Sequence, residues 1–183
     1  MTITGEPWKS RDPAARNVQL VQVPSDVLAA LAGEDLDSAR TMTTMGLTPY
    51  LVIDECSGVW RRRRDQIARN PGDAPWVTRL AVDVDSGQVV GRAGYHGPPD
   101  ERGMVEIGYS VDPVHRRQGY ARAALMILLE IAKSHPQVTV VRAAVRPDNV
   151  PSRRLLDQYG FQEVGSQWDE EDGLEVILEV CAS

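Results

Sequence analysis

The chain has 183 residues, and its 20 Lys and Arg against 26 Asp and Glu give a formal net charge of -6 at pH 7. This acidic balance argues against a general nucleic-acid binder, which needs a basic surface. Apolar residues make up 42% of the chain and charged residues 25%, as is ordinary for a globular protein. No run approaches a membrane span and no apolar signal core opens the sequence, so we expect a cytoplasmic protein without a membrane partner.

Cysteine usage and acidic clusters predict no metal site. Cys56 and Cys181 are too few for a disulfide framework, and neither has a His partner at metal-ligand spacing. The acidic cluster at residues 169–172 lacks the loop pattern of a calcium site, so we expect a turn tip there.

The first half of the chain predicts one strand followed by helices. Residues 1–17 are polar and show no periodicity, so we expect a loose arm. Residues 18–23 indicate the first strand. Three helical segments follow, at residues 25–33, 35–46 and 54–69. Ser25 is the expected N-cap of the first of them.

The third helical segment carries four consecutive arginines, Arg61 to Arg64. Runs of like charge usually form a solvated helix face, and Asp54, Glu55 and Asp65 flank this one. The alternative is a wall of the acceptor site that favours an acidic substrate. We rank the solvated face ahead of it.

The second half of the chain predicts a sheet with two more helices. Strands are expected at residues 77–84, 88–95, 105–111, 138–145, 161–168 and 174–180. Helices are expected at residues 121–132 and 152–159, the second closed by Gly160. This order predicts one α+β domain over residues 1–183, with a mixed, largely antiparallel sheet of six to seven strands flanked by helices.

The most informative stretch runs from the strand at residues 105–111 into the following helix. Apolar residues alternate there with polar or small ones, in the two-residue period of a strand. Between strand and helix lies Arg116-x-x-Gly119-x-Ala121, where residues without bulky side chains adjoin a helix start. A helix start presents free N–H groups and the positive end of the helix dipole. The stretch is therefore a candidate phosphate or pyrophosphate cradle, although an ordinary basic turn would explain that glycine alone.

Three short motifs occur in one order along the chain: Arg116-x-x-Gly119-x-Ala121, Asn149-x-x-Ser152 and Gly160-Phe161. Together they resemble the acyl-CoA-binding segments of the GNAT superfamily of N-acyltransferases over residues 76–180, and the Rim-type branch most. The resemblance implies a GNAT-like fold and an enzyme that moves an acetyl group from acetyl-CoA to a primary amine of a small molecule or protein N-terminus. The implied partners are acetyl-CoA, as acyl donor, and an amine acceptor.

The resemblance also assigns the cofactor-binding residues. Backbone groups of Tyr109, Ser110 and Val111 would hold the pantetheine arm of acetyl-CoA. Asn149 and Ser152 would contact the cofactor arm, and Asn149 is also a candidate helix cap. The pyrophosphate would meet the loop and helix start made of Arg116, Arg117, Gln118, Gly119, Tyr120 and Ala121.

Glu106 is the candidate catalytic base, at the strand position where several GNAT enzymes carry a glutamate. It shares a strand face with small residues at positions 108 and 110, which leave room for a substrate. Partial burial would raise its pKa, or it would act on the ammonium through water. The alternatives are an ion pair with Arg92 or Arg142, and His96 as a second candidate base.

One position departs from the family pattern. Many GNAT enzymes protonate the leaving thiolate with a tyrosine seven positions after the asparagine, and Leu156 stands there. Tyr159 precedes Gly160-Phe161, so we expect it to pack. Ser152, solvent or no acid at all remain open, because a thiol pKa of roughly 8.5 makes the thiolate a fair leaving group.

Two other functions fit parts of the sequence. A non-catalytic acyl-CoA-binding sensor or scaffold would keep the cofactor motifs and dispense with the tyrosine, whereas Glu106 favours catalysis. A nucleic-acid-binding domain would use the arginine clusters, but interleaved aromatic residues are missing. We expect a monomer or homodimer, and the sequence does not identify the amine.

Overall fold

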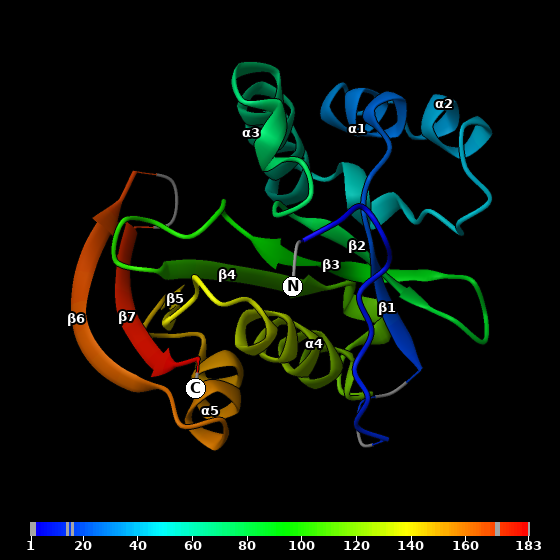
Figure 1. The fold of residues 1–183 in the computed structure, drawn as a ribbon. Coiled ribbons are helices and arrows are strands. Elements are labelled where there is room, and N and C mark those ends of the chain that lie inside the picture. The colour runs from blue at the N-terminus through cyan, green and yellow to red at the C-terminus, as the bar shows by residue number, and fades with distance from the viewer. Residues whose placement is uncertain (1–2, 14, 16, 171–172, 183) are drawn as a thin grey trace.

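The computed structural model of the chain describes residues 3–13, 15, 17–170 and 173–182. Seven strands form one sheet in the order β1-β2-β3-β4-β5-β7-β6 (Figure 1). The strands are β1 (Val18–Val21), β2 (Arg79–Asp83), β3 (Val89–Tyr95), β4 (Met104–Val111), β5 (Val140–Val145), β6 (Gln162–Asp169) and β7 (Gly173–Cys181). The helices are α1 (Ser25–Ala32), α2 (Leu36–Thr41), α3 (Asp54–Arg69), α4 (Tyr120–Ser134) and α5 (Val150–Gln158). Short 3-10 helices are η1 (Pro49–Val52), η2 (Pro71–Asp73) and η3 (Pro113–His115).

This architecture confirms the predicted mixed fold with a largely antiparallel sheet. The neighbouring strands are antiparallel except for β4 and β5, which are parallel. Helices α1, α2 and α3 cover one face of the sheet, and α4 and α5 cover the other (Figure 1). Helix α4 fully buries Leu125 and Leu128 among other apolar residues. Each buried leucine stabilises the fold by about 1.5–3 kcal/mol, which explains why this helix lies flat against the sheet.

The parallel strands β4 and β5 separate halfway along their length. The first four residues of β4, through Ile107, pair with the first four of β5, through Ala143. Beyond this point β4 continues along β3, whereas β5 continues along β7. The two strands therefore part at Gly108 and Ala144, and the pairing between them ends in the middle of the sheet.

The described residues of the predicted loose arm are fastened to the sheet. Trp8 is buried and exchanges two backbone hydrogen bonds with Leu20 of β1, at 3.0 and 2.9 Å. The Arg79 guanidinium lies 3.6 Å from the Trp8 ring and donates to the carbonyl groups of Thr4 and Glu6. Burial lowers the pKa of Arg79 to about 10, so it stays charged at neutral pH. The prediction of a loose arm is wrong for these residues, because one aromatic anchor outweighs a polar composition.

Two helix starts differ from the predicted ones. Ser25 is the first residue of α1, and Pro24 occupies the cap position without a side-chain hydrogen bond, so the predicted Ser25 cap is wrong. The Asp26 carboxylate instead accepts a backbone N–H of the first turn at 2.8 Å. Helix α5 begins at Val150, two residues before the predicted start, because Asn149 caps it.

Candidate active site

The turn between β4 and α4 is bent by two residues in the left-handed region. Arg117 has φ 62° and Gly119 has φ 89°. Glycine adopts this conformation at little cost because it lacks a Cβ, and Gly119 directly precedes Tyr120, the first residue of α4. The first amides of α4 have no acceptor within the helix. The turn therefore has the free donors and the positive dipole end that an anion cradle requires.

Three arginines add positive charge beside this helix start. Arg117, Arg122 and Arg154 line a cavity of about 440 Å³ between the start of α4 and α5. Arg122 Nη2 donates to Gln158 Oε1 at 2.6 Å and so links the two helices. No sequence motif includes Arg154, and only the packing of α5 brings it to this cavity.

Two of the predicted cofactor residues use their side chains within the protein. Arg116 Nε donates to the Val111 carbonyl at 3.1 Å and closes the turn after β4. The Tyr120 side chain is buried, and its hydroxyl donates to Asp83 at 2.9 Å. Tyr120 therefore offers an anion its backbone amide rather than its hydroxyl.

Tyr109, Asn149 and Ser152 meet on the face of β4 that α4 and α5 cover. Asn149 accepts the Ser152 N–H at 3.3 Å, which confirms its predicted alternative role as a helix cap. The Ser152 and Tyr109 hydroxyl oxygens lie 2.8 Å apart. Burial raises the pKa of Tyr109, against the smaller opposite effect of this hydrogen bond, so the phenol keeps its proton at neutral pH.

Leu156 and Tyr159 lie on the apolar side of α5. Leu156, at the position of the family's tyrosine, is fully buried in the core. Tyr159 packs against the same core, as predicted, with its ring 5.9 Å from the Arg122 guanidinium. A tyrosine hydroxyl does reach Ser152, but it comes from Tyr109 on β4.

Glu106 and His96 form a pair on the opposite face of β4. His96 Nδ1 lies 3.3 Å from Glu106 Oε1, and the two side chains are 48% and 23% exposed. Burial raises the pKa of Glu106, but the hydrogen bond and charge of His96, with the charges of Arg142 and Arg63, hold that pKa below its ordinary value. The expectation of a raised pKa is therefore wrong, because it did not include the neighbouring imidazole.

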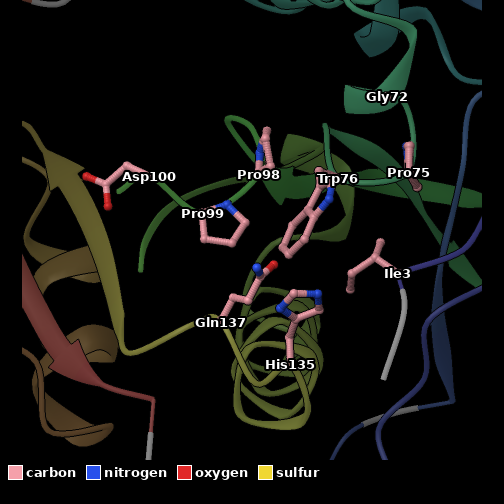
Figure 2. Close-up of a pocket in the computed structure, with 9 residues that line it drawn as sticks. All are labelled: Ile3, Gly72, Pro75, Trp76, Pro98, Pro99, Asp100, His135 and Gln137. Carbon is pink, nitrogen blue, oxygen red and sulfur yellow. The ribbon is translucent and has the colours of Figure 1, made fainter. Parts of the chain in front are cut away.

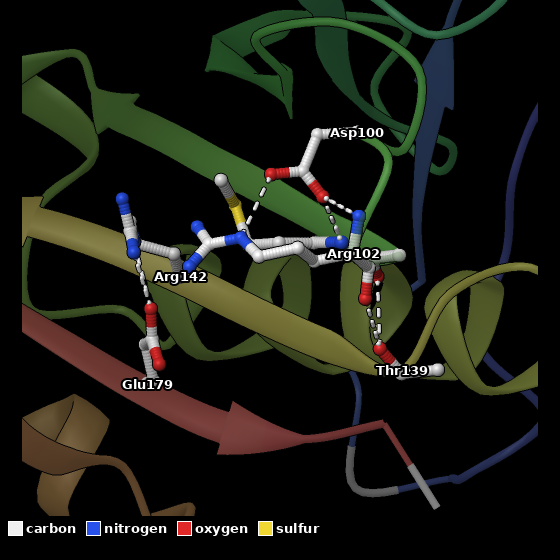
Figure 3. Close-up of polar contacts among 7 residues, drawn as sticks. Asp100, Arg102, Thr139, Arg142 and Glu179 are labelled. Atoms are coloured by element: carbon white, nitrogen blue, oxygen red, sulfur yellow. Dashed lines mark hydrogen bonds and ion pairs between the residues drawn. The ribbon is translucent and has the colours of Figure 1, made fainter.

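The two arginines proposed as partners of Glu106 pair elsewhere. Arg142 binds Glu179 across β5 and β7, with a nitrogen–oxygen distance of 2.6 Å (Figure 3). Arg92 Nη2 lies 3.7 Å from Glu55. Glu106 is thus paired with His96, and Arg142 acts on it only through its charge.

Backbone hydrogen bonds hold His96 from both sides. Its N–H donates to the Glu106 carbonyl at 2.8 Å. Its carbonyl accepts from Arg63 Nη1 at 3.2 Å and from Gln66 Nε2 at 3.0 Å, both on α3. A Cβ placed on Gly108 would lie 3.0 Å from His96 Nε2, so the imidazole lies over the point where β4 and β5 part. His96 therefore fills part of the space that Gly108 was expected to leave for a substrate.

The structure divides the arginine run of α3. Arg61 and Arg64 form exposed ion pairs with Glu34 and Asp65, as a solvated face requires. Arg63 turns toward the sheet, and burial lowers its pKa to about 10. One arginine of the four thus supports the loop that carries His96.

A second polar cluster lies on the α3 side of β4, nearer its C-terminal end. The hydroxyls of Tyr50 and Ser110 are hydrogen-bonded, and Ser110 also donates to Glu55 at 3.3 Å. Arg92 of β3 lies opposite Ser110, and its buried Nε has no hydrogen-bond partner in the described part of the chain. Burial raises the pKa of Tyr50 to about 12. Sequence analysis missed Tyr50 because no motif includes it.

Hydrogen bonds also fix the loop between β3 and β4 (Figure 3). The Asp100 carboxylate accepts the N–H groups of Arg102 and Met104, at 2.8 and 2.9 Å. The Met104 bond is the main reason that the pKa of Asp100 lies below its ordinary value. Thr139 donates to the Arg102 carbonyl at 2.8 Å and ties the loop to the start of β5.

A second cavity, of about 370 Å³, lies beside this loop at the C-terminal end of α4 (Figure 2). Ring side chains form most of its wall: Pro75, Trp76, Pro98, Pro99 and His135. The lining residues are separate from the predicted site residues.

Within residues 3–13, 15, 17–170 and 173–182, no three His, Cys, Asp or Glu side chains gather as metal ligands. No helix of the same residues is long and apolar enough to cross a bilayer. Cys56 is buried and Cys181 exposed, both as free thiols.

Residues 18–162 match the acetyltransferase (GNAT) domain. The uncharacterized N-acetyltransferase YjdG of Bacillus subtilis (strain 168) is 35% identical over 98 residues, which are 54% of this chain and 58% of that protein. The match therefore spans less than two thirds of that relative. The uncharacterized N-acetyltransferase p20 of Bacillus licheniformis is 29% identical over 136 residues, which are 74% of each protein.

Solved structures show the same fold. RimJ of Mycobacterium smegmatis, in complex with CoA-disulfide, superposes with a TM-score of 0.63 at 23% identity, covering 97% of this chain and 86% of that one. At this identity the similarity shows the shared fold. The matched domain spans β1 to the start of β6 and includes the turn before α4 and the start of α5. The chain therefore belongs to the GNAT family of acetyltransferases, as its three sequence motifs predicted.

Proposed function

We propose that this protein transfers the acetyl group of acetyl-CoA to a primary amine of a small molecule or of a protein N-terminus. The observation that carries the proposal is the end of the pairing between β4 and β5 at Gly108. Tyr109 and Ser152 lie toward α5 near this point, whereas Glu106 and His96 lie toward α3. A thioester bound from the first side would meet an amine bound from the second.

Acetyl-CoA is the acyl donor in this proposal. The amides from Arg117 to Ala121 would meet its pyrophosphate, and the arginine-lined cavity would take the charged nucleotide end. Residues 109–111 of β4 have no β5 partner in the described sheet, so their backbone groups would pair with the amides of the pantetheine arm. Asn149 and Ser152 would lie beside that arm.

The acceptor amine must lose a proton, and the leaving thiolate must be stabilised. We assign the first task to the pair of Glu106 and His96. The lowered pKa of Glu106 keeps its carboxylate ionised at neutral pH, which stabilises a neighbouring cation. We assign the second task to the Ser152 hydroxyl, with Tyr109 as its hydrogen-bond partner.

The alternative function is a non-catalytic acyl-CoA-binding sensor or scaffold. Such a module needs only the pyrophosphate cradle and the part of β4 that would bind the pantetheine arm. The polar groups on the α3 side of β4 would then have no function, although each buried polar group that lacks a partner costs about 1–3 kcal/mol. The buried Nε of Arg92 bears this cost, and together with the pair of Glu106 and His96 it supports catalysis over binding alone.

We further propose a cytoplasmic monomer or homodimer without a nucleic-acid or membrane partner and without a metal. The net charge of -6 supports the absence of a nucleic-acid partner. The two free thiols support a reducing compartment.

The test is release of free CoA from acetyl-CoA, followed with a thiol reagent. The acceptors are an alanine-starting tripeptide amide and a set of short diamines and amino acids. We expect saturable, amine-dependent CoA release and an acetylated product by mass spectrometry. Binding of acetyl-CoA by calorimetry without CoA release from any amine would instead support the sensor.

A further inference from the structure

We infer that Nε2 of His96 is the atom that accepts the proton of the acceptor amine, and that Glu106 is a positioning residue that orients the imidazole. The inference rests on the proposed acetyl transfer and assigns one step of it. His96 Nδ1 faces Glu106 Oε1 at 3.3 Å, so this nitrogen is occupied by the carboxylate. The other ring nitrogen, Nε2, is therefore the one that can contact a substrate.

The position of Nε2 is set by the strand beneath it. A Cβ added to Gly108 would lie 3.0 Å from Nε2. Gly108 is the first β4 residue beyond the pairing with β5. Nε2 makes no hydrogen bond to the described part of the chain. The carbonyl carbon of a thioester held along residues 109–111 would lie near this point. An amine that attacks it would thus come within reach of Nε2.

The inferred tautomer follows from the ion pair. A carboxylate 3.3 Å from Nδ1 favours a proton on that nitrogen, which would leave Nε2 unprotonated in the neutral ring. A general base works best when its pKa lies near the operating pH. The pKa of Glu106 is held below that of an ordinary carboxyl group, so this carboxylate is a weak proton acceptor at neutral pH. It is, however, well suited to stabilise the imidazolium that forms.

Charged groups from several elements surround the imidazole. Glu106 comes from β4, and Arg142 of β5 and Arg63 of α3 act on Glu106 through their charges. Asp73 of η2 binds the Gln66 amide, which in turn holds the His96 carbonyl. Among these groups, the Glu106 carboxylate lies next to the ring, 3.3 Å from Nδ1.

The proton balance of the step is complete. The ammonium of the acceptor gives one proton to Nε2 and becomes a neutral amine. Its nitrogen forms the bond to the acetyl carbon, and the carbon–sulfur bond breaks with its electron pair on sulfur. The second proton of that nitrogen neutralises the thiolate, through Ser152 or water, and the imidazolium returns its proton to solvent.

The kinetic test compares His96→Gln, Glu106→Gln and the double variant. We expect kcat of His96→Gln to fall by about 10²–10⁴, the usual value of a general base, with the affinity for acetyl-CoA retained. The kcat of the double variant should be no lower than that of either single variant, because the two residues act as a unit. His96→Gly leaves a space over Gly108, and added imidazole should restore part of its rate. The matched control is His135→Gln, which changes a histidine at the end of α4. Its kcat should stay within a few fold of the wild-type value.

Nitrogen-15 NMR of the His96 ring tests the orientation without an acceptor. We expect the Nδ1–H tautomer at neutral pH, and a shift toward Nε2–H in Glu106→Gln. A dominant Nε2–H form in the wild type overturns the inference. A normal rate for His96→Gln beside a slow Glu106→Gln also overturns it and makes Glu106 the base. Failure of the proposed function is seen separately, as a wild type that releases no CoA with any amine.

Discussion

The two faces of β4 come from alternate residues of one strand, yet their chemistry differs. On the α3 side, Glu106 pairs with His96 of the neighbouring loop, and Ser110 contacts Tyr50, 60 positions away. On the α4 side, Val105 and Ile107 are buried in the core, and Tyr109 alone brings a hydroxyl, which contacts α5. In the proposed function, the strand thus separates proton transfer on one face from support and donor binding on the other.

This separation can be tested, because changes on the two faces should affect different quantities. Changes on the α3 side should lower the rate and leave acetyl-CoA binding intact. Changes near the turn after β4 should weaken acetyl-CoA binding. The predictions that follow run from the largest expected effect to the smallest.

Glu106→Gln keeps the shape of the side chain and removes its charge. We expect kcat to fall by about 10²–10⁴. The affinity for acetyl-CoA should hold, because the proposed contacts to the donor come from the strand backbone and not from this side chain. The loss should shrink as pH rises, because more of the amine is already neutral. CoA release from pH 6 to 9 and calorimetry measure these quantities.

The same variant has a predicted effect on stability. The pKa of Glu106 is lowered in the folded protein, so its ionisation stabilises the fold above the unfolded pKa, and this contribution is lost as pH falls through the folded pKa. Thermal unfolding should therefore show Glu106→Gln less stable than the wild type at pH 7 and not at acid pH. A stability loss with a normal rate would identify the pair with His96 as purely structural.

Gly119→Glu places a negative charge and a side chain in the anion cradle. We expect acetyl-CoA affinity to fall by about 100-fold or more, about 2.7 kcal/mol, with the fold retained. Gly87→Glu is the matched control, since Gly87 also has a positive φ, of 68°, and open space around its Cβ position. Calorimetry with both variants separates the effect of the site from that of a strained residue. Equal affinities for wild type and Gly119→Glu would remove the cradle from the proposal.

Ser152→Ala removes the proposed hydrogen bond to the leaving thiolate. One hydrogen bond contributes about 0.5–1.5 kcal/mol, so we expect a loss in kcat of up to about tenfold. Tyr109→Phe removes the partner of Ser152 and should have a smaller effect, because the serine hydroxyl remains. Single-turnover CoA release measures both. A larger loss for Tyr109→Phe would make the phenol the direct donor.

Tyr159→Phe should change turnover by no more than a few fold, because this ring packs against the core. Steady-state CoA release checks it. A loss of about a hundredfold, the scale of a general acid, would show that Tyr159 replaces the missing family tyrosine. In that case Tyr109 would be the residue that packs.

Much of the fold was predictable because it depends on local patterns. The alternation in residues 105–111 identifies β4, and the apolar run that follows identifies α4. Gly119 predicts the turn between them, since its left-handed conformation suits glycine. The errors lie where one long-range contact outweighs composition. Trp8 fastens the described part of the arm although its neighbours are polar.

The site was predictable only in part for the same reason. Sequence analysis proposed Glu106 and His96 separately as bases, and the antiparallel register of β3 and β4 brings them together. It treated Arg61 to Arg64 as one run, but helical periodicity turns Arg63 toward the carbonyl of His96. It had no reason to select Tyr50, whose hydroxyl meets Ser110 from 60 positions away.

The sequence by itself determined the order of elements, the two faces of β4 and the glycine turn before α4, because the period of a strand and the conformation of a glycine are local properties. The tertiary structure decided which distant side chains those faces meet. The hydroxyls of Tyr109 and Ser152, 43 positions apart, lie within hydrogen-bond distance only because α5 packs under β4. The pairing of Glu106 with His96 likewise decides that the pKa of Glu106 is lowered. The pKa of a carboxylate depends on the charges that lie next to it in space, and not on where the carboxylate stands in the chain.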